Sequence, residues 1–90
     1  MLIKRSNLRK LGAQIRFLRE QKGYTQEGFA AKSGLDRAYY GGIERGERNV
    51  SALNLLLIAV NLGVEAGDIF PSLGDLEFEE EEDAIGMGVE

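Results

Sequence analysis

The sequence predicts a small all-α domain, and three observations carry that prediction. Apolar residues recur at the 3.6-residue period of a helix along most of the chain, only one proline interrupts it, and capping residues and glycines separate the periodic stretches. At 90 residues with 43% hydrophobic side chains, the chain suffices for one domain with one modest core. We expect a compact five-helix bundle in residues 1–71 and an acidic C-terminal tail in residues 72–90.

The first helix is expected from about Ser6 to Gln21. Its apolar positions fall on one helical face and are Leu8, Leu11, Ile15 and Leu18. Ser6 or Asn7 can cap the start, and Gly23 can adopt the left-handed conformation that commonly follows a helix end.

A second, shorter helix is expected from Thr25 to Ser33. The Thr25 hydroxyl can accept a hydrogen bond from an amide of the first turn, and Gly34 marks the end of the helix. Phe29 and Ala30 lie on the side that is expected to face the core. A tight turn at Gly34 then leads into another helix, which predicts a helix-turn-helix arrangement.

The third expected helix begins after its N-cap, Asp36, and runs to about Arg45, where Gly46 ends it. Tyr40 and Ile43 are three residues apart and are expected in the core. The rest of this helix faces elsewhere and carries Arg37, Ala38, Tyr39, Gly41 and Gly42. Each of the two glycines costs the helix about 1 kcal/mol relative to alanine. They indicate either close approach of the backbone to a partner or simple tolerance on an exposed face.

The fourth helix is expected over Ala52–Leu62, capped by Ser51 and ended by Gly63, and a last short turn over Glu65–Phe70 stops at Pro71. One apolar stripe of the fourth helix is expected in the core and consists of Leu55, Ile58, Ala59 and Leu62. A second apolar stripe, offset from the first, consists of Leu53, Leu56, Leu57 and Val60.

A helix that is apolar nearly all round must be buried nearly all round. Either a second subunit covers the second stripe, or the acidic tail folds back with its own apolar residues, Leu76, Phe78, Ile85, Met87 and Val89. We favour a homodimer whose interface is the second stripe, with the tail contributing. Burial of each such side chain is worth about 1.5–3 kcal/mol before the costs of association.

Residue counts exclude several classes of function. The chain has no Cys and no His, so it offers no disulfide, no thiolate zinc site and no imidazole as general base or metal ligand. We therefore expect no enzyme, no metal, no cofactor and no small-molecule substrate. No apolar run reaches the roughly 18 residues of a membrane span, and the N-terminus lacks the features of a signal peptide, which predicts a cytoplasmic protein with no membrane partner.

Charge is divided unequally along the chain. Residues 1–50 hold all 11 Lys and Arg against five acidic residues, a balance of +6, and residues 51–90 hold ten acidic residues and no basic one, a balance of −10. The basic half suits a polyanion such as nucleic acid. The tail, with its run Glu79–Asp83, is interpreted first as a solvated extension. Otherwise it keeps this end of the protein off DNA or contacts a basic partner such as RNA polymerase.

Residues that match in order, from the first expected helix to just beyond the third, give the chain a resemblance to a known family. They are Leu18-Arg19…Gly23-Tyr24-Thr25-Gln26-Glu27…Phe29-Ala30…Ser33-Gly34-Leu35…Ile43-Glu44-Arg45-Gly46…Arg48. This pattern resembles the phage repressor/Cro-type, or XRE-like, helix-turn-helix family over roughly residues 6–70. The run from Leu35 to Asn49 is most similar to the controller proteins of restriction–modification systems. The resemblance implies a lambda-repressor-like fold and a homodimeric, sequence-specific transcriptional regulator on a palindromic operator in double-stranded DNA.

The resemblance also implies roles for individual residues. The second helix would cross the DNA backbone while the third enters the major groove, where base edges are read by Arg37, Ala38 and Tyr39. Phosphate contacts are expected from Thr25, Gln26, Arg45, Arg48 and Asn49. In the family, the positions of Arg19 and Glu44 form a partly buried ion pair that serves orientation rather than net stability.

Two other functions stay open on the sequence. An antitoxin of a toxin–antitoxin pair would bind its own operator with the basic half and a toxin with the acidic, partly apolar tail. A scaffold protein would use the same helical shell without DNA. Gly28 and the pair Gly41–Gly42 depart from the family's pattern, but neither departure removes a group that DNA binding requires.

Overall fold

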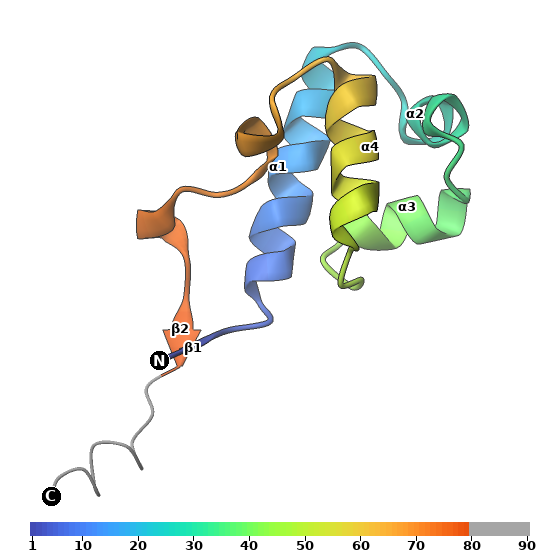
Figure 1. The fold of residues 1–90 in the computed structure, drawn as a ribbon. Helices are drawn as coiled ribbons and strands as arrows, with labels where there is room; N and C mark the ends of the chain where they lie inside the picture. Colours follow the sequence, from blue (N-terminus) through green and yellow to red (C-terminus); the bar gives the residue numbers. More distant parts are fainter. Residues whose placement is uncertain (80–90) are drawn as a thin grey trace, which may run out of the picture.

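The computed structural model describes residues 1–79, and these residues form a mainly helical fold (Figure 1). Within them lie four α-helices, two 3₁₀-helices and one sheet of two short strands, in the order β1 (Leu2–Ile3), α1 (Asn7–Gln21), α2 (Gln26–Ser33), α3 (Arg37–Glu44), α4 (Ala52–Leu62), η1 (Ala66–Ile69), η2 (Leu73–Asp75) and β2 (Phe78–Glu79). The predicted all-α class is confirmed, and the five predicted helices correspond to α1–α4 and η1. The tail residues 80–90, which hold most of the acidic run, lie outside the described residues.

Local capping explains why α2, α3 and α4 begin and end where the sequence predicts. The side chains of Thr25, Asp36 and Ser51 each accept a hydrogen bond from the backbone amide three residues later, at 2.9, 3.0 and 3.2 Å. Gly34 and Gly63 end α2 and α4 with φ of 72° and 73°, in the left-handed region that side chains disfavour. These signals act within one turn of the helix end, so they are readable from sequence alone.

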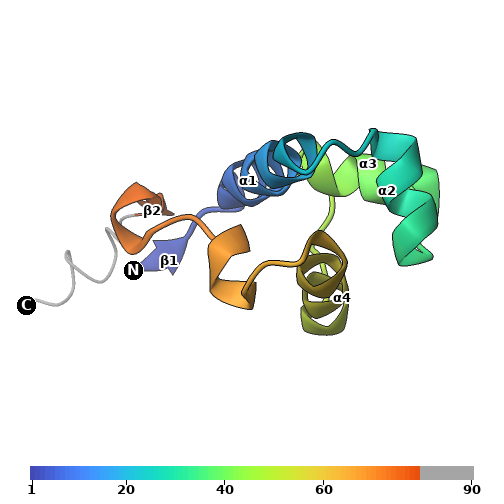
Figure 2. The same ribbon diagram turned by 90° about the horizontal axis from the view of Figure 1, so that it is seen from above.

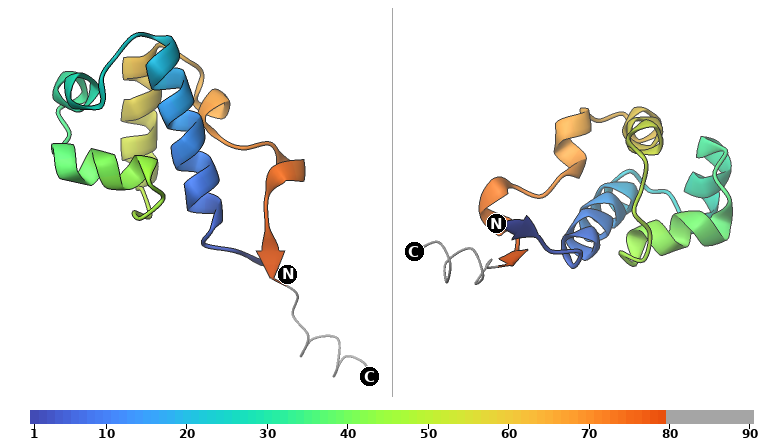
Figure 3. Two further views of the ribbon diagram at one scale, coloured as in Figure 1. Left: turned by 180° about the vertical axis from the view of Figure 1, so that it is seen from behind. Right: turned by 60° about the horizontal axis from the view of Figure 1, so that its bottom comes forward.

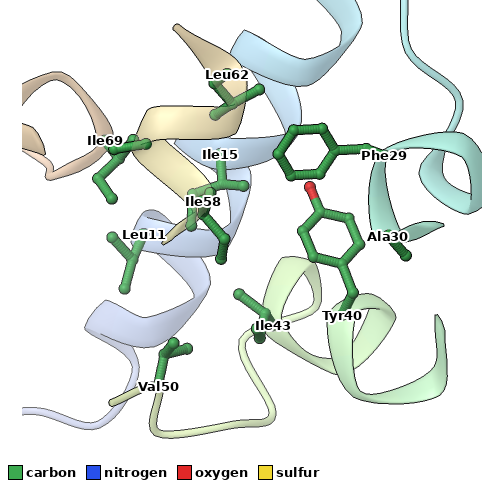
Figure 4. Packing of buried hydrophobic residues seen from close by; sticks show 11 residues of the cluster. Leu11, Ile15, Phe29, Ala30, Tyr40, Ile43, Val50, Ile58, Leu62 and Ile69 are labelled. Carbon is green, nitrogen blue, oxygen red and sulfur yellow. The ribbon is translucent and has the colours of Figure 1, made fainter. Parts of the chain in front are cut away.

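The core lies where α2 and α3 meet α1 and α4 (Figure 4). The rings of Phe29 and Tyr40 are tilted against each other with centroids 5.3 Å apart. The fully or nearly buried apolar residues are Leu11, Ile15, Phe29, Ala30, Tyr40, Ile43, Val50, Ile58, Ala59, Leu62 and Ile69. This confirms the predicted core positions, except that Leu8, Leu18 and Leu55 are only partly buried at its edge. Seen from above, α4 and η1 lie on one side of the layer formed by α1 and α3 (Figure 2).

The backbones of α1 and α3 touch at Gly12. A Cβ atom at this position would lie 2.3 Å from the carbonyl oxygen of Ile43 and 2.5 Å from that of Glu44. No real Cβ contact is that short, and a backbone carbonyl in a helix cannot move aside. Glycine at position 12 therefore fixes how closely α3 packs on α1.

The segment that follows η2 returns to the N-terminus, on the far side of α1 from α2 and α3 (Figures 1 and 3). Strand β2 pairs antiparallel with β1, with Ile3 opposite Phe78. The buried side chain of Asn7 donates to the carbonyl of Glu77 at 2.7 Å and accepts from the Glu77 amide at 2.8 Å. Ser6 occupies the N-cap of α1 but makes no capping bond; its hydroxyl donates to the Glu77 carboxylate instead.

Among the described residues, no single helix has the length and hydropathy to cross a membrane. The segments Ala52–Leu62 and Ala66–Asp75 meet that criterion only when taken together, and they are bent by 101° with respect to each other.

Candidate nucleic-acid interface

Helices α2 and α3 form the predicted helix-turn-helix unit. Three residues join them, and each has a distinct structural role. Gly34 supplies the left-handed backbone conformation, the amide of Leu35 donates to the carbonyl of Ala30 at 2.9 Å, and Asp36 caps α3. The half-buried side chain of Leu35 packs against the core, so the turn is held at both ends and in the middle.

The start of α3 presents the first of the residues expected to read bases. Arg37 is the first residue of α3, and Arg37 and Ala38 are exposed. Nη2 of Arg37 lies 3.0 Å from Oε2 of Glu27 in α2. A surface hollow brings together residues from both helices and from the end of α3, namely Gln26, Asp36, Arg37, Ala38, Gly41 and Arg45. Four residues expected to contact DNA thus share one face.

Tyr39 has a second set of contacts that the sequence did not reveal. It is half-buried, and its hydroxyl accepts a hydrogen bond from Nδ2 of Asn54 at 3.0 Å. The guanidinium of Arg48 lies 5.8 Å from the centroid of its ring, within the range of a cation–π contact. Asn54, one of only two polar residues within α4, was missed by the sequence analysis. An amide in an otherwise apolar helix is the signal that could have indicated it.

The N-terminal end of α2 can hold an anion. Because a helix leaves its first amides without intrahelical partners, and Thr25 caps only that of Gly28, the amides of Gln26 and Glu27 can donate to a phosphate. The Gln26 side chain is half-buried, and its Nε2 donates a hydrogen bond to Oε1 of Glu44 at 3.0 Å. Gln26 therefore connects this helix end to the buried part of α3.

The other residues expected to contact phosphates follow the end of α3. Arg45 is exposed, with its Nη2 3.1 Å from Oε1 of Glu47. Arg48 is exposed beside Tyr39. Asn49 is exposed too, but it also lines an apolar groove beside the start of α1, away from the hollow that contains Arg37. The structure therefore groups Arg45 with Arg37 and places Asn49 at the edge of the candidate interface.

The two glycines of α3 do not lie on an open face. A Cβ atom at Gly41 would lie 3.1 Å from Nη1 of Arg45 and 3.3 Å from Oε1 of Gln26. A Cβ atom at Gly42 would lie 3.0 Å from Cγ of Arg48. Both glycines are buried beneath side chains that were expected to contact phosphate, which argues against tolerance on an exposed face. Their small size lets Gln26, Arg45 and Arg48 lie close to the α3 backbone.

Arg19 and Glu44 meet beneath this face. Nε and Nη2 of Arg19 donate to the two carboxylate oxygens of Glu44 at 2.7 and 3.1 Å, and both residues are buried. Burial opposes the charged form of Glu44, but favourable interactions, those with Arg19 first, outweigh it and hold the pKa of that carboxyl below its ordinary value. The bond to Glu44 likewise raises the pKa of Arg19 against the effect of burial. The pair therefore stays charged and ties α1 to the end of α3.

The second apolar stripe of α4 faces solvent in the described chain. Leu53, Leu56 and Val60 are 77%, 53% and 70% exposed, and Leu57 is half-buried. Residues 72–79 do not cover this stripe, because they run along α1 to pair with β1. Three large exposed aliphatic side chains on one helix are unusual for an isolated subunit.

Comparisons with known proteins identify relatives of this chain. The profile of the family described as "Helix-turn-helix" matches residues 15–69. Control protein C.MunI from Mycoplasma sp is 42% identical over 65 residues, which are 71% of this chain and 88% of that protein. The crystal structure of the restriction-modification controller protein C.AhdI from Aeromonas hydrophila is 49% identical, with a TM-score of 0.70 over 72% of this chain and 98% of that one.

A further structure shows a relative with DNA. It contains the restriction-modification controller protein C.Esp1396I as a tetramer in complex with its natural 35 base-pair operator. Its identity to this chain is 44% and its TM-score 0.63, over 69% of this chain and 82% of that one. Since the family profile matches more than half of the residues, and a solved controller protein shares 49% identity and the fold with a TM-score of 0.70, this chain belongs to the XRE-like helix-turn-helix family, whose members include restriction-modification controller proteins.

Proposed function

We propose that this chain is a sequence-specific, double-stranded-DNA-binding transcriptional regulator that acts as a homodimer on a palindromic operator, as a controller protein of a restriction–modification system. The observation that carries the proposal is the exposed Arg37 at the first position of α3, on one face with the start of α2 and with Arg45. The family profile and the operator-bound relative support it.

Base reading is assigned to the N-terminal residues of α3. With α3 in the major groove, the guanidinium of Arg37 can donate two parallel hydrogen bonds to O6 and N7 of guanine. Such a bidentate contact discriminates against a wrong base by about 1–3 kcal/mol. Ala38 and the ring of Tyr39 offer apolar surface to a thymine methyl group. The bond from Asn54 fixes the direction of the Tyr39 side chain before DNA binds.

Phosphate contacts are assigned around the same face. One group of contacts comes from the amides at the N-terminal end of α2. The other comes from Arg45 and Arg48, which follow the C-terminal end of α3. Contacts of this kind set the register of the protein on the duplex without reading its sequence. Residues 1–50, which contain all of them, carry the +6 charge balance that attracts the backbone.

A homodimer through α4 is the second part of the proposal. The exposed stripe of Leu53, Leu56 and Val60, with Leu57 beside it, is the surface we assign to the subunit interface. Two subunits related by a twofold axis would present two α3 helices to half-sites about 34 Å apart. The tetramer of C.Esp1396I on its operator supports assembly on DNA.

DNA as partner implies a cytoplasmic protein, and the family offers no reason to expect catalysis. No described feature favours the antitoxin alternative. That alternative, like the contact to RNA polymerase, depends on the acidic tail, most of whose acidic run lies outside the described residues.

The proposal is tested by a mobility-shift titration with the DNA upstream of the protein's own gene, at several salt concentrations, against a scrambled duplex of equal length. We expect at least about 10³-fold tighter binding to the upstream DNA, with two chains per site or a multiple of two, and weaker binding as salt rises. A methyltransferase or nuclease gene beside it would support the controller assignment. Equal affinity for both duplexes at every salt concentration would contradict the proposed function.

A further inference from the structure

Two exposed arginines of the candidate interface each form an ion pair with a glutamate. Nη2 of Arg37 lies 3.0 Å from Glu27, and Nη2 of Arg45 lies 3.1 Å from Glu47. All four side chains are more than half exposed. The bond from Arg45 lowers the pKa of Glu47 below its ordinary value, so this carboxylate is charged at neutral pH.

Stability does not account for these pairs. Exposed ion pairs contribute little to folding, because water and salt screen them and the long side chains lose freedom. On a surface that docks against phosphates, each carboxylate also adds repulsion. A protein that needed only affinity for DNA would gain from the absence of Glu27 and Glu47. Ion pairing alone therefore does not explain why a glutamate lies beside each of the two arginines.

We infer that Glu27 is a specificity-determining residue whose carboxylate holds Arg37 for its base contact, and that the carboxylates of Glu27 and Glu47 together oppose sequence-independent contact with the DNA backbone. The inference rests on the proposed function and names how the same face selects its DNA. Non-specific binding needs only phosphates near cations, and it meets both carboxylates without compensation. Operator binding meets the same repulsion, so the ratio of the two affinities depends on how Glu27 orients Arg37 toward the bases.

Glu27 acts at two points of the interface. It is the second residue of α2, beside the amides that can receive a phosphate, so its charge competes with a phosphate there. It also engages one nitrogen of Arg37, a side chain that has five N–H donors. The remaining donors stay available to guanine, with the guanidinium already oriented. Glu47 acts on phosphate contact alone, since Arg45 follows the end of α3.

The matched control is Glu20, which forms a third exposed pair of the same kind. Oε2 of Glu20 lies 3.2 Å from Nε of Arg16 and 4.0 Å from Nη2 of Arg19, both in α1, outside the hollow formed by α2 and α3. Glu20→Gln, Glu27→Gln and Glu47→Gln change the net charge by the same amount. All three positions are exposed, so each variant is expected to fold, and only Glu27→Gln should lower the melting temperature slightly, because Glu27 interacts favourably with the N-terminal end of α2.

The experiment measures Kd for two duplexes of equal length, one selected by the wild-type protein from a random-sequence pool and one scrambled. We expect Glu27→Gln and Glu47→Gln to tighten binding to the scrambled duplex about three- to tenfold, and Glu20→Gln to change it less than twofold. For Glu27→Gln, the ratio of the two Kd values should fall at least about threefold, because Arg37 also loses its orienting partner.

Each outcome bears on one claim. If Glu27→Gln and Glu47→Gln bind the scrambled duplex no more tightly than Glu20→Gln does, or if Glu27→Gln keeps the wild-type ratio of Kd values, the inference is overturned while the proposed function stands. If the wild-type protein selects no sequence from the pool, the proposed function fails, and the inference fails with it.

Discussion

The side chain of Gln26 at the start of α2 donates to the same carboxylate, that of Glu44, which Arg19 holds from α1. Three helices therefore meet at one buried charge, directly beneath the face assigned to DNA. An ion pair of this kind gains little net stability, because desolvation offsets the attraction, but it fixes the relative orientation of the helices that bear it. A change at Glu44 should thus affect both folding and the placement of Gln26.

Glu44→Ala is expected to lower the free energy of unfolding by about 3 kcal/mol or more, because it leaves the Arg19 guanidinium buried without its partner. Urea denaturation followed by circular dichroism measures the change. The double variant Arg19→Met/Glu44→Leu is the control, since it removes both charges and should be more stable than Glu44→Ala. A double variant less stable than the single one would show that the pair itself stabilises the fold.

Acid should weaken the fold through Glu44. Its pKa is lowered in the folded state, so the stability it contributes is complete above the ordinary glutamate value of about 4.3 and is lost as pH falls through the folded pKa. The difference in unfolding free energy between wild type and Glu44→Gln should be constant near neutral pH and shrink below about pH 4.3. Other carboxylates titrate in both proteins and cancel. A difference that stayed constant to low pH would mean that Glu44 is not held in its charged form.

Arg37→Ala should weaken binding to the selected duplex by about 1–3 kcal/mol and relax the choice of base at one position of each half-site. Arg16→Ala removes an equally charged, exposed residue from α1 and should lower the affinity much less. The two Kd values, and a second selection performed with the variant, give the comparison. Equal losses of affinity for the two variants would mean that Arg37 contributes only its positive charge and reads no base.

Leu56→Glu should abolish the homodimer, because it places a charge in the middle of the exposed α4 stripe. Phe17→Glu is the matched control: Phe17 on α1 is 52% exposed, against 53% for Leu56, but lies outside the stripe. Sedimentation velocity should then show monomer for Leu56→Glu and dimer for both wild type and Phe17→Glu. A dimeric Leu56→Glu would move the subunit interface away from α4.

Which parts of the fold were predictable follows from the range of the interactions. Caps at Thr25, Asp36 and Ser51 act over three residues, so the bounds of α2–α4 could be predicted closely. The pairing of Ile3 with Phe78 joins residues far apart in the chain, and two-residue strands carry no periodic signal. The cap expected of Ser6 or Asn7 does not form for the same reason, since both side chains bond Glu77 instead.

For the site, residue types were readable and side-chain partners were not. The helix-turn-helix pattern identified Arg37 and Tyr39, but nothing in it indicated that Asn54 holds the tyrosine hydroxyl or that Glu27 holds the arginine. Both contacts cross from one helix to another. They depend on the crossing of α2, α3 and α4, which a single sequence does not encode in any local window.

The contact of α1 and α3 at Gly12 leaves α3 without a hinge of its own. In the proposed dimer, the subunit interface then fixes the distance and angle between the two α3 helices. A change in the spacing of the half-sites is not compensated by movement of α3 within its subunit. Each base pair inserted between two half-sites rotates one about the DNA axis by about 34–36° relative to the other. A protein built this rigidly distinguishes operators by the helical phase of their half-sites as well as by their bases.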